Sequence, residues 1–189
     1  MIAKTFLLAL LALSPLTPVL QGVRASDAAP GWQQIVAARA QLYGHRNWIV
    51  IADAAYPAQS RSGIETITTE AGQTEVLRHV LSLLDRQSHV RPVVYTDAEL
   101  PHVAESDAPG IATYRKELAE LLTERTVNTL PHEQIIAKLD QAGATFHILI
   151  LKTNLTLPYT SVFLELDCGY WSGDAERRLR QAFSPTPAK

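Results

Sequence analysis

An unbroken apolar run at residues 48–51 constrains the fold of this chain more than any other feature. Trp48, Ile49, Val50 and Ile51 are aromatic or β-branched, and a strand without polar positions is typical of one that is covered on both faces. Asp53 follows the run, and a Pro-containing loop comes next. In open α/β sheets, ligands bind at the carboxyl ends of strands, because the departing loops form a crevice there. Asp53 is therefore the first candidate site residue.

Helical and strand patterns alternate along the rest of the chain. Apolar spacing predicts helices that begin near Ser26 or Asp27 and end before Gly44, and that cover residues 74–84, 111–122, 131–143 and 174–183. Short apolar runs predict strands at residues 48–52, 92–95, 126–130, 145–151 and 160–166, with a brief extension at 64–68. This alternation predicts an α/β fold in three layers, a mainly parallel sheet with helices on both faces. No internal boundary is visible, so residues 26–183 are predicted to form a single domain.

The composition is that of a soluble domain with a sizeable core. Of 189 residues, 47% are hydrophobic and 19% are charged. The net charge is −2 and both signs are scattered, so the chain lacks the basic face that neutralises phosphates. We therefore expect no nucleic-acid partner.

Residues 1–25 have the pattern of a secretory signal peptide. Lys4 precedes an apolar stretch, and Val23-Arg24-Ala25 resembles a cleavage site. The alternative is a membrane anchor, but the apolar stretch is short for a hydrocarbon layer of about 30 Å. We expect cleavage, a periplasmic or secreted protein, and no membrane partner afterwards. Residues 184–189 are predicted to be a flexible tail.

His45 and Asp53 flank the first strand, and each has two interpretations. Histidine exchanges a proton near neutral pH, so His45 is either an acid/base group or a surface histidine past a helix end. Asp53 either accepts hydrogen bonds from a ligand or caps the loop that follows it. The residues alone leave both alternatives open.

His132 follows Pro131 in the first turn of a predicted helix. Free N–H groups and the helix dipole disfavour an imidazolium there, so a neutral ring that binds oxygen atoms is one interpretation. An exposed first-turn histidine is the other. The sequence contains no HExxH motif, no GxSxG elbow, no phosphate-binding glycine loop and no GxGxxG fingerprint. We therefore expect no metal site and no nucleotide or hydrolase chemistry.

Three short motifs resemble the sugar mutarotase family of D-ribose pyranase and L-fucose mutarotase. They are Tyr43-Gly44-His45 with the apolar strand and the loop DAAYPAQS that begins at Asp53, then His132-Glu133-Gln134, then Pro158-Tyr159-Thr160-Ser161. Their order matches over roughly residues 33–169. The loop text is nearer the fucose branch, whereas HEQ resembles the ribose branch.

The resemblance implies an isomerase that interconverts ring forms of a free monosaccharide without a cofactor. It implies that His45 is the catalytic acid/base group and that the sugar contacts Asp53, His132, Tyr159 and Ser161. Ser161 stands where the family has asparagine, and Asn154-Leu155 where it usually has Gly-Glu. These departures motivate the alternative of a non-catalytic sugar-binding or scaffold protein.

His45 and Asp53 are too far apart in sequence to serve one sugar from one straight strand. At about 3.3 Å per residue, a straight path separates them by roughly 25 Å. Members of the resembled family form rings with sites between subunits, which implies a homo-oligomer here, a ring such as a decamer, that pairs the two residues across chains.

Overall fold

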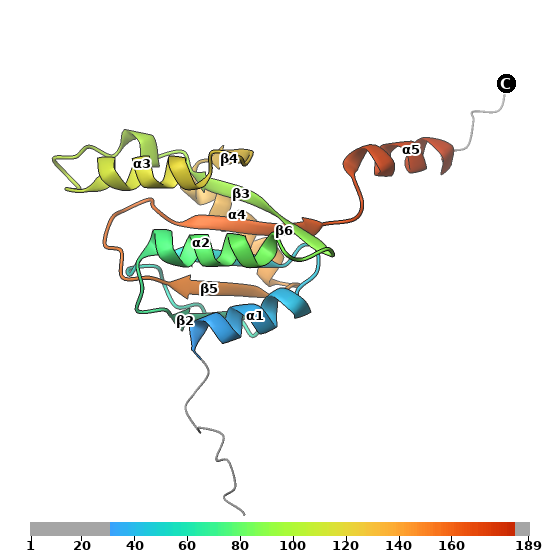
Figure 1. Cartoon of the computed structure of the whole chain (residues 1–189), viewed down its shortest axis with the longest axis horizontal. Coiled ribbons are helices and arrows are strands. Elements are labelled where there is room, and N and C mark those ends of the chain that lie inside the picture. The colour runs from blue at the N-terminus through green and yellow to red at the C-terminus, as the bar shows by residue number, and fades with distance from the viewer. Residues whose placement is uncertain (1–30, 184–189) are drawn as a thin grey trace, which may run out of the picture.

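The computed structural model describes residues 31–183 (Figure 1). In chain order the elements are α1 (Trp32–Leu42), β1 (Trp48–Ala52), β2 (Ile64–Thr68), α2 (Gln73–Leu84), β3 (Val90–Asp97), a 3-10 turn (Leu100–His102), α3 (Ile111–Leu121), β4 (Val127–Leu130), α4 (His132–Gly143), β5 (Ile148–Lys152), β6 (Val162–Cys168) and α5 (Gly173–Phe183). The predicted signal peptide and the predicted tail at 184–189 lie outside the described residues.

The strands form one mixed sheet in the order β2-β5-β1-β6-β3-β4. The pairs β2–β5, β5–β1 and β3–β4 are parallel, whereas β6 is antiparallel to both β1 and β3. A parallel partner requires a long crossover, usually a helix. The connection from β5 to β6 has no helix, so β6 returns in the opposite direction. The predicted α/β fold with a mainly parallel sheet is confirmed.

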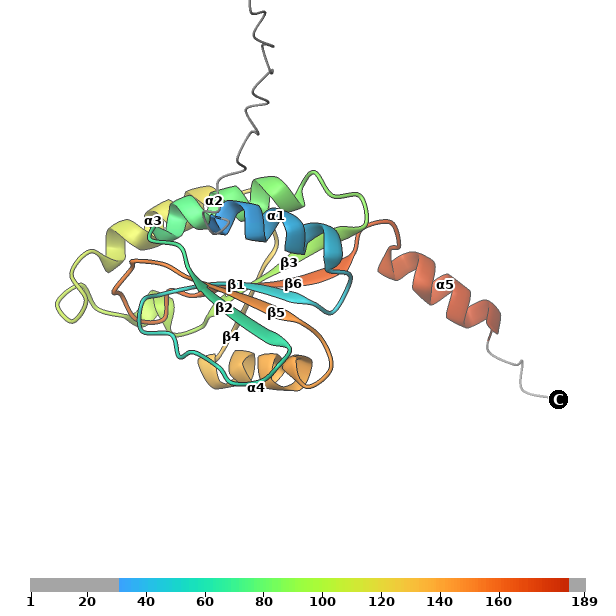
Figure 2. The ribbon, with the colours of Figure 1, turned by 90° about the horizontal axis from the view of Figure 1, so that it is seen from below.

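Helices cover both faces of the sheet (Figure 2). α1, α2 and α3 lie on one face and α4 lies on the other. β1 is buried along its whole length, with Ile49 and Ile51 in the core beneath α1–α3 and Trp48, Val50 and Ala52 in the core beneath α4. Successive side chains of a strand point to opposite faces, so a strand between two helical layers needs apolar residues throughout. This is the physical origin of the run at 48–51.

Several boundaries differ from those predicted. α1 has Gly31 as its N-cap, so the cap predicted at Ser26 or Asp27 is wrong. Gly31 is extended, so the helix begins after it at Trp32, and Ser26 and Asp27 themselves lie outside the described residues. β3 is longer than the predicted residues 92–95, because it pairs with β6 from Val90 to Thr96 and ends at Asp97. The carboxylate of Asp97 therefore lies at the end of β3, at the edge of the sheet.

α5 stands apart from the three layers. It leaves the body after β6, points away from the sheet, and buries none of its residues (Figures 1 and 2). Within residues 31–183, none of the helices is long and apolar enough to cross a membrane.

Candidate functional site

A cavity of about 460 Å³ opens at the carboxyl ends of the parallel strands. Three segments meet there: the loop after β1, the first turns of α4, and the connection that precedes β6. The lining residues are Asp53, Ala55, Tyr56, Pro57, Gln59, His132, Glu133, Ile136, Pro158 and Tyr159. The structure therefore brings three of the predicted site residues, Asp53, His132 and Tyr159, around one space.

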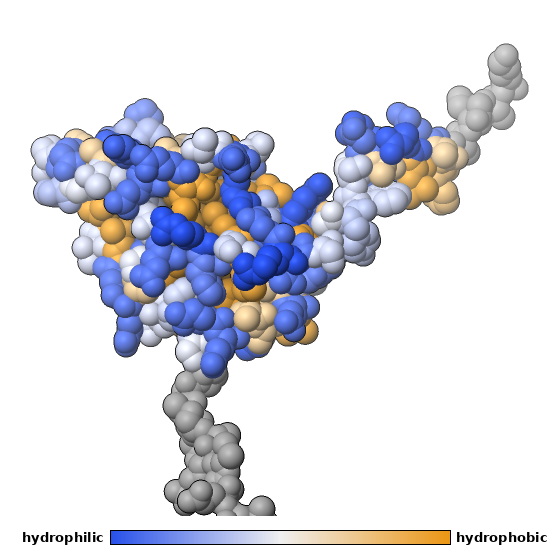
Figure 3. All heavy atoms as spheres, viewed as in Figure 1, coloured by the Kyte–Doolittle hydropathy of each residue, from blue (hydrophilic) through white to orange (hydrophobic). Residues whose placement is uncertain are grey.

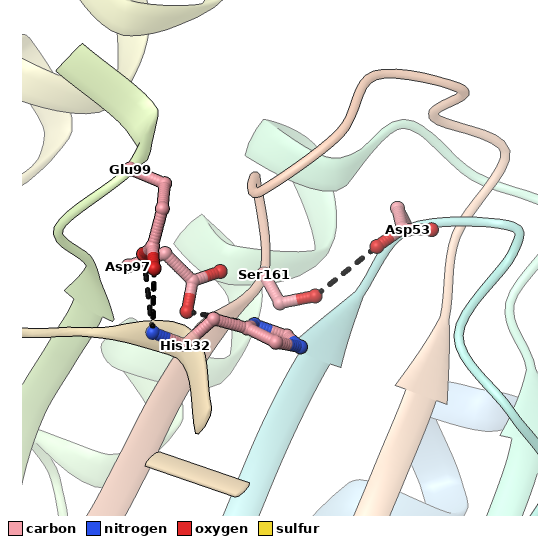
Figure 4. Close-up of polar contacts among 5 residues, drawn as sticks. All are labelled: Asp53, Asp97, Glu99, His132 and Ser161. Atoms are coloured by element: carbon pink, nitrogen blue, oxygen red, sulfur yellow. Dashed lines mark hydrogen bonds and ion pairs between the residues drawn. The ribbon is translucent and has the colours of Figure 1, made fainter. Parts of the chain in front are cut away.

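Asp53 follows β1 and uses both carboxylate oxygens. Oδ1 accepts a hydrogen bond from the Ala55 N–H at 2.8 Å, and Oδ2 accepts one from Ser161 Oγ at 3.3 Å (Figure 4). The first bond is the loop cap considered as an alternative role. The second joins two of the predicted sugar-binding residues, which come from neighbouring strands β1 and β6.

His132 is the first residue of α4 and is held at two points. Its backbone N–H donates to both carboxylate oxygens of Glu99 at 3.1 Å, and its ring Nδ1 lies 3.1 Å from Asp97 Oδ1 (Figure 4). When Asp97 is ionised it can only accept, so Nδ1 then carries the proton and Nε2 keeps its lone pair. The ring edge also packs on Tyr159, with 5.7 Å between ring centroids. Two carboxylates, those of Asp97 and Glu99, therefore contact His132, in addition to the helix dipole considered above.

Asp97 is a buried carboxylate that the sequence analysis did not identify. Its side chain is fully buried, and burial raises its pKa above the ordinary 3.8. The hydrogen bond and charge of His132 oppose that rise, whereas the charges of Glu99 and Asp53 add to it. Asp97 is the last residue of β3 and Asp53 directly follows β1, so the rule that selected Asp53 also applies to Asp97. The predicted strand ended too early to show this.

Two buried polar atoms near the site have no hydrogen-bond partner among residues 31–183. They are Asp97 Oδ2 and the hydroxyl of Tyr56. Burial raises the pKa of Tyr56 to about 12, and the charges of Asp140 and Asp97 add to this effect, so the phenol is a neutral donor. An unpaired buried polar group costs about 1–3 kcal/mol. A ligand rich in hydroxyl groups has the donors and acceptors that such atoms lack.

Tyr159 has a strained backbone that a buried network holds in place. Its φ is +56°, a conformation that non-glycine residues rarely adopt. The adjacent carbonyl of Thr160 accepts hydrogen bonds from Tyr114 Oη, at 2.6 Å, and from Gln73 Nε2. Gln73 also accepts one from Thr153 Oγ1 at 3.2 Å. A buried amide on α2 therefore fixes both ends of the connection that carries Tyr159 and Ser161.

His45 lies at the opposite edge of the sheet. It is exposed in the turn before β1, whereas Asp53 follows the other end of the same strand. Asp167, near the end of β6, lies close enough for the charge of His45 to act on it. Burial favours a higher pKa for Asp167, but hydrogen bonds from Arg91 and the Cys168 N–H, with the charges of Arg91 and His45, lower it overall. Within one chain, His45 and the cavity are not brought together.

The described part of the chain contains no group of three or more His, Cys, Asp and Glu side chains arranged to hold a metal ion. The cavity offers instead an imidazole paired with a carboxylate, a second carboxylate and phenol groups. These are groups that bind hydroxyls and transfer protons.

The fold and the cavity together define a mixed α/β protein with a cavity lined by ionisable side chains at the carboxyl edge of its sheet. The model of the RbsD / FucU transport protein family matches residues 33–168, well over half of the chain. The chain belongs to this family. The match runs from α1 to the end of β6 and stops before α5.

One solved structure supports the fold. RbsD of Bacillus subtilis, solved with D-ribose, superposes with a TM-score of 0.50 at 20% identity, covering 73% of this chain and 95% of that one. The fucose mutarotase of Streptococcus pneumoniae, solved with L-fucose, gives a TM-score of 0.46 at 24% identity, covering 68% and 87%. A search of curated proteins finds no match. The expectation that the Asp53 loop is nearer the fucose branch stays a prediction.

Proposed function

We propose that this protein is a mutarotase that interconverts ring forms or anomers of a free monosaccharide. The observation that carries the proposal is the cavity lined by Asp53, Tyr159 and His132, with the His132 ring paired with buried Asp97 behind it. Membership of the family and the sugars present in the solved structures of RbsD and fucose mutarotase point to the same ligand class.

The proposed reaction needs only proton transfer. A base takes the proton of the anomeric hydroxyl, whose oxygen becomes a carbonyl as the bond from the anomeric carbon to the ring oxygen breaks. An acid protonates that ring oxygen, and closure on the other face of the carbonyl reverses both transfers. In this proposal Asp53, His132, Tyr159 and Ser161 orient the hydroxyls, and no cofactor takes part.

We assign the proton transfer to His45 of a neighbouring copy. β1 pairs with β5 over Trp48–Ala52 and with β6 over Trp48–Ile51, so the path between His45 and Asp53 is extended. One sugar can touch both residues only if the turn before β1 in one copy meets the cavity of the next. The proposed enzyme is therefore a homo-oligomer with shared sites.

The second candidate is a sugar-binding or scaffold protein without turnover. Two observations favour it: Ser161 is already bonded to Asp53, and Leu155, where the family usually has a carboxylate, packs its side chain against the core. Both reduce the polar groups left for a sugar. This candidate predicts saturable sugar binding with no change in anomer exchange.

The two candidates separate in a single NMR experiment. Exchange between anomers of ribose, fucose and galactose is measured by magnetisation transfer, with and without protein, beside calorimetric titration of each sugar. The proposed mutarotase accelerates exchange for at least one sugar, and His132→Ala removes the acceleration. Binding without acceleration on any sugar would reject the enzyme and retain the binding protein.

Export through residues 1–25 is a separate proposal, which rests on the sequence pattern alone. The expected mature chain begins after Ala25. Mass spectrometry of the protein recovered from the producing cells and from the medium tests it, and an intact Met1 in every fraction would reject cleavage.

A further inference from the structure

We infer that α5 is an arm that docks on a second copy of this chain, at the edge that carries the Asp53 cavity. The choice of partner rests on the shared site proposed above. The contacts and charges that support it are independent of catalysis.

α5 is a well-formed helix that packs none of its side chains into the rest of residues 31–183. Ser172 Oγ accepts a hydrogen bond from the Ala175 N–H at its start, and Glu176 accepts one from Trp171 Nε1 at 2.8 Å. None of its residues is buried. Isolated helices shorter than about 12–15 residues are marginal in water, and packing of an apolar face usually supplies the missing stability. α5 has 11 residues, so it needs such a partner.

The arm has an apolar face to offer. Ala175, Leu179, Ala182 and Phe183 follow helical spacing, and Figure 3 shows apolar side chains gathered on one side of the projecting helix. Phe183 is 87% exposed. The exposed large apolar residues among the described residues are Leu42, Tyr159, Tyr170, Trp171, Leu179 and Phe183. Two of them lie on α5, and Tyr170 and Trp171 lie in the connection that leads to it. Monomeric proteins rarely expose apolar surface in one such group.

The position of the arm identifies the partner as a second copy. α5 begins a few residues after β6, whose Leu166 accepts a hydrogen bond from the Arg46 N–H beside His45. A copy that meets His45 with its cavity edge therefore also meets the arm. That receiving edge is apolar at the cavity mouth, where Pro57, Pro158 and Tyr159 are exposed.

The charges at the two edges are complementary. Connections at the cavity edge include Asp53, Glu70, Asp97, Glu99, Glu105 and Glu133. The opposite edge carries Arg46, Arg61 and Arg86. α5 carries Arg177, Arg178 and Arg180, of which Arg177 and Arg180 pair with Asp174 and Glu176 on the same helix, so the helix keeps a small positive charge. Attraction between opposite charges favours contact of the cavity edge of one copy with the opposite edge of the next, which is a head-to-tail arrangement, whereas two identical edges repel each other.

The test is sedimentation velocity on the full chain. We expect the wild type to sediment as an oligomer, and Leu179→Glu with Phe183→Glu to weaken association roughly tenfold or more. Gln181→Glu is the matched control, because it adds the same carboxylate on the polar side of α5 and is expected to change nothing. A monomeric wild type, or a double variant that assembles like the wild type, would overturn the inference.

A cross-linking experiment tests the receiving edge. In a Cys168→Ser background, chains with Phe183→Cys are mixed with chains with Pro57→Cys and oxidised. The expected product is a cross-linked dimer, whereas Ser88→Cys at the opposite edge is the control and is expected to give none. Dimers with Ser88→Cys alone would overturn the assigned edge.

Two further measurements separate this inference from its alternatives. Anomer exchange is followed on the same samples. If assembly depends on the arm but no exchange is accelerated, the inference about α5 holds and the proposed enzyme activity is rejected. If exchange is accelerated but assembly does not depend on the arm, the activity holds and the inference is rejected. Pelleting of a monomeric wild type with anionic lipid vesicles, abolished by Leu179→Glu, would overturn the inference and assign the arm to a lipid surface.

Discussion

The two edges of the sheet differ in how much of their chemistry one chain completes. At the cavity edge, Asp53, Asp97 and His132 are each fixed by hydrogen bonds from other segments. At the opposite edge His45 is exposed, and α5 extends into solvent. The contrast shows that one chain preorganises the side chains at the cavity edge and leaves those at the opposite edge exposed. An open side is what a contact between copies requires.

The largest expected effect tests whether the two edges form one site. His45→Ala and Asp53→Asn, measured separately, are each expected to lower anomer exchange by roughly 100-fold or more, because each removes a group that touches the sugar. When the two variants are unfolded together and refolded as a mixture, about a quarter of the sites in random oligomers regain both residues. Exchange should return to about that fraction of wild type.

The control for this experiment is each variant refolded alone, which is expected to regain nothing. Full activity of His45→Ala would remove the open edge from the reaction. Two inactive variants that fail to complement, although sizing shows mixed oligomers, would confine the site to one chain.

The second prediction concerns how firmly the cavity edge is held. Gln73→Ala removes a buried amide that bonds Thr160, Tyr114 and Thr153, so the free energy of unfolding is expected to fall by about 2 kcal/mol. Sugar affinity should fall as well, because the same amide fixes the connection that carries Tyr159. Urea unfolding and calorimetric titration measure the two effects. Gln134→Ala, at an exposed position on α4, serves as the control, and equal losses in both variants would refute the role of Gln73.

The sequence predicted the sheet well because burial imposes a pattern that a single chain shows. The apolar run at 48–51 and the helical spacings of α2, α3 and α4 follow from local periodicity. Asp53 and His132 were singled out because they stand next to a strand end and a helix start, and both line the cavity, whereas their roles stay predictions. The separation of His45 from Asp53 followed from strand geometry alone.

The missed residues depend on tertiary contacts. Asp97 lies next to His132 only because β3 and β4 pair in parallel and α4 begins directly after β4. Gln73 is the first residue of α2 and is indistinguishable in sequence from a solvated helix start, yet it is 2% exposed. Neither fact is encoded in local spacing.

The third prediction is that one substitution at the cavity edge lowers activity and raises stability. Asp97→Asn is expected to lower anomer exchange roughly tenfold, because an amide does not fix one tautomer of His132 as an ionised carboxylate does. The same variant is expected to be more stable than wild type at neutral pH. Burial raises the pKa of Asp97 above its ordinary 3.8, so ionisation disfavours the folded state.

The raised pKa of Asp97 determines how the stability difference between the two proteins changes with pH. The stability of the wild type relative to Asp97→Asn is highest below the unfolded pKa and falls as pH rises from there through the raised folded pKa. Thermal unfolding of both proteins between pH 3 and pH 8 measures the difference, with the exposed Asp107→Asn as control. A variant that is less stable than wild type at every pH would show that the bond to His132 outweighs burial.

The smallest expected effect lies at the open edge. Asp167 pairs with Arg91 at 2.6 Å, but the two side chains are 44% and 49% exposed, so solvent screens the pair. Asp167→Asn is therefore expected to cost about 0.2–1 kcal/mol. The pKa of Asp167 is lowered in the folded state, so this contribution is present above the unfolded value of 3.8 and is lost as pH falls through the folded pKa. Urea unfolding at neutral and acid pH, in a double-mutant cycle with Arg91→Gln, measures it. A loss that rivals that of Gln73→Ala would mean that the open edge is as firmly built as the cavity edge, and would remove the contrast between them.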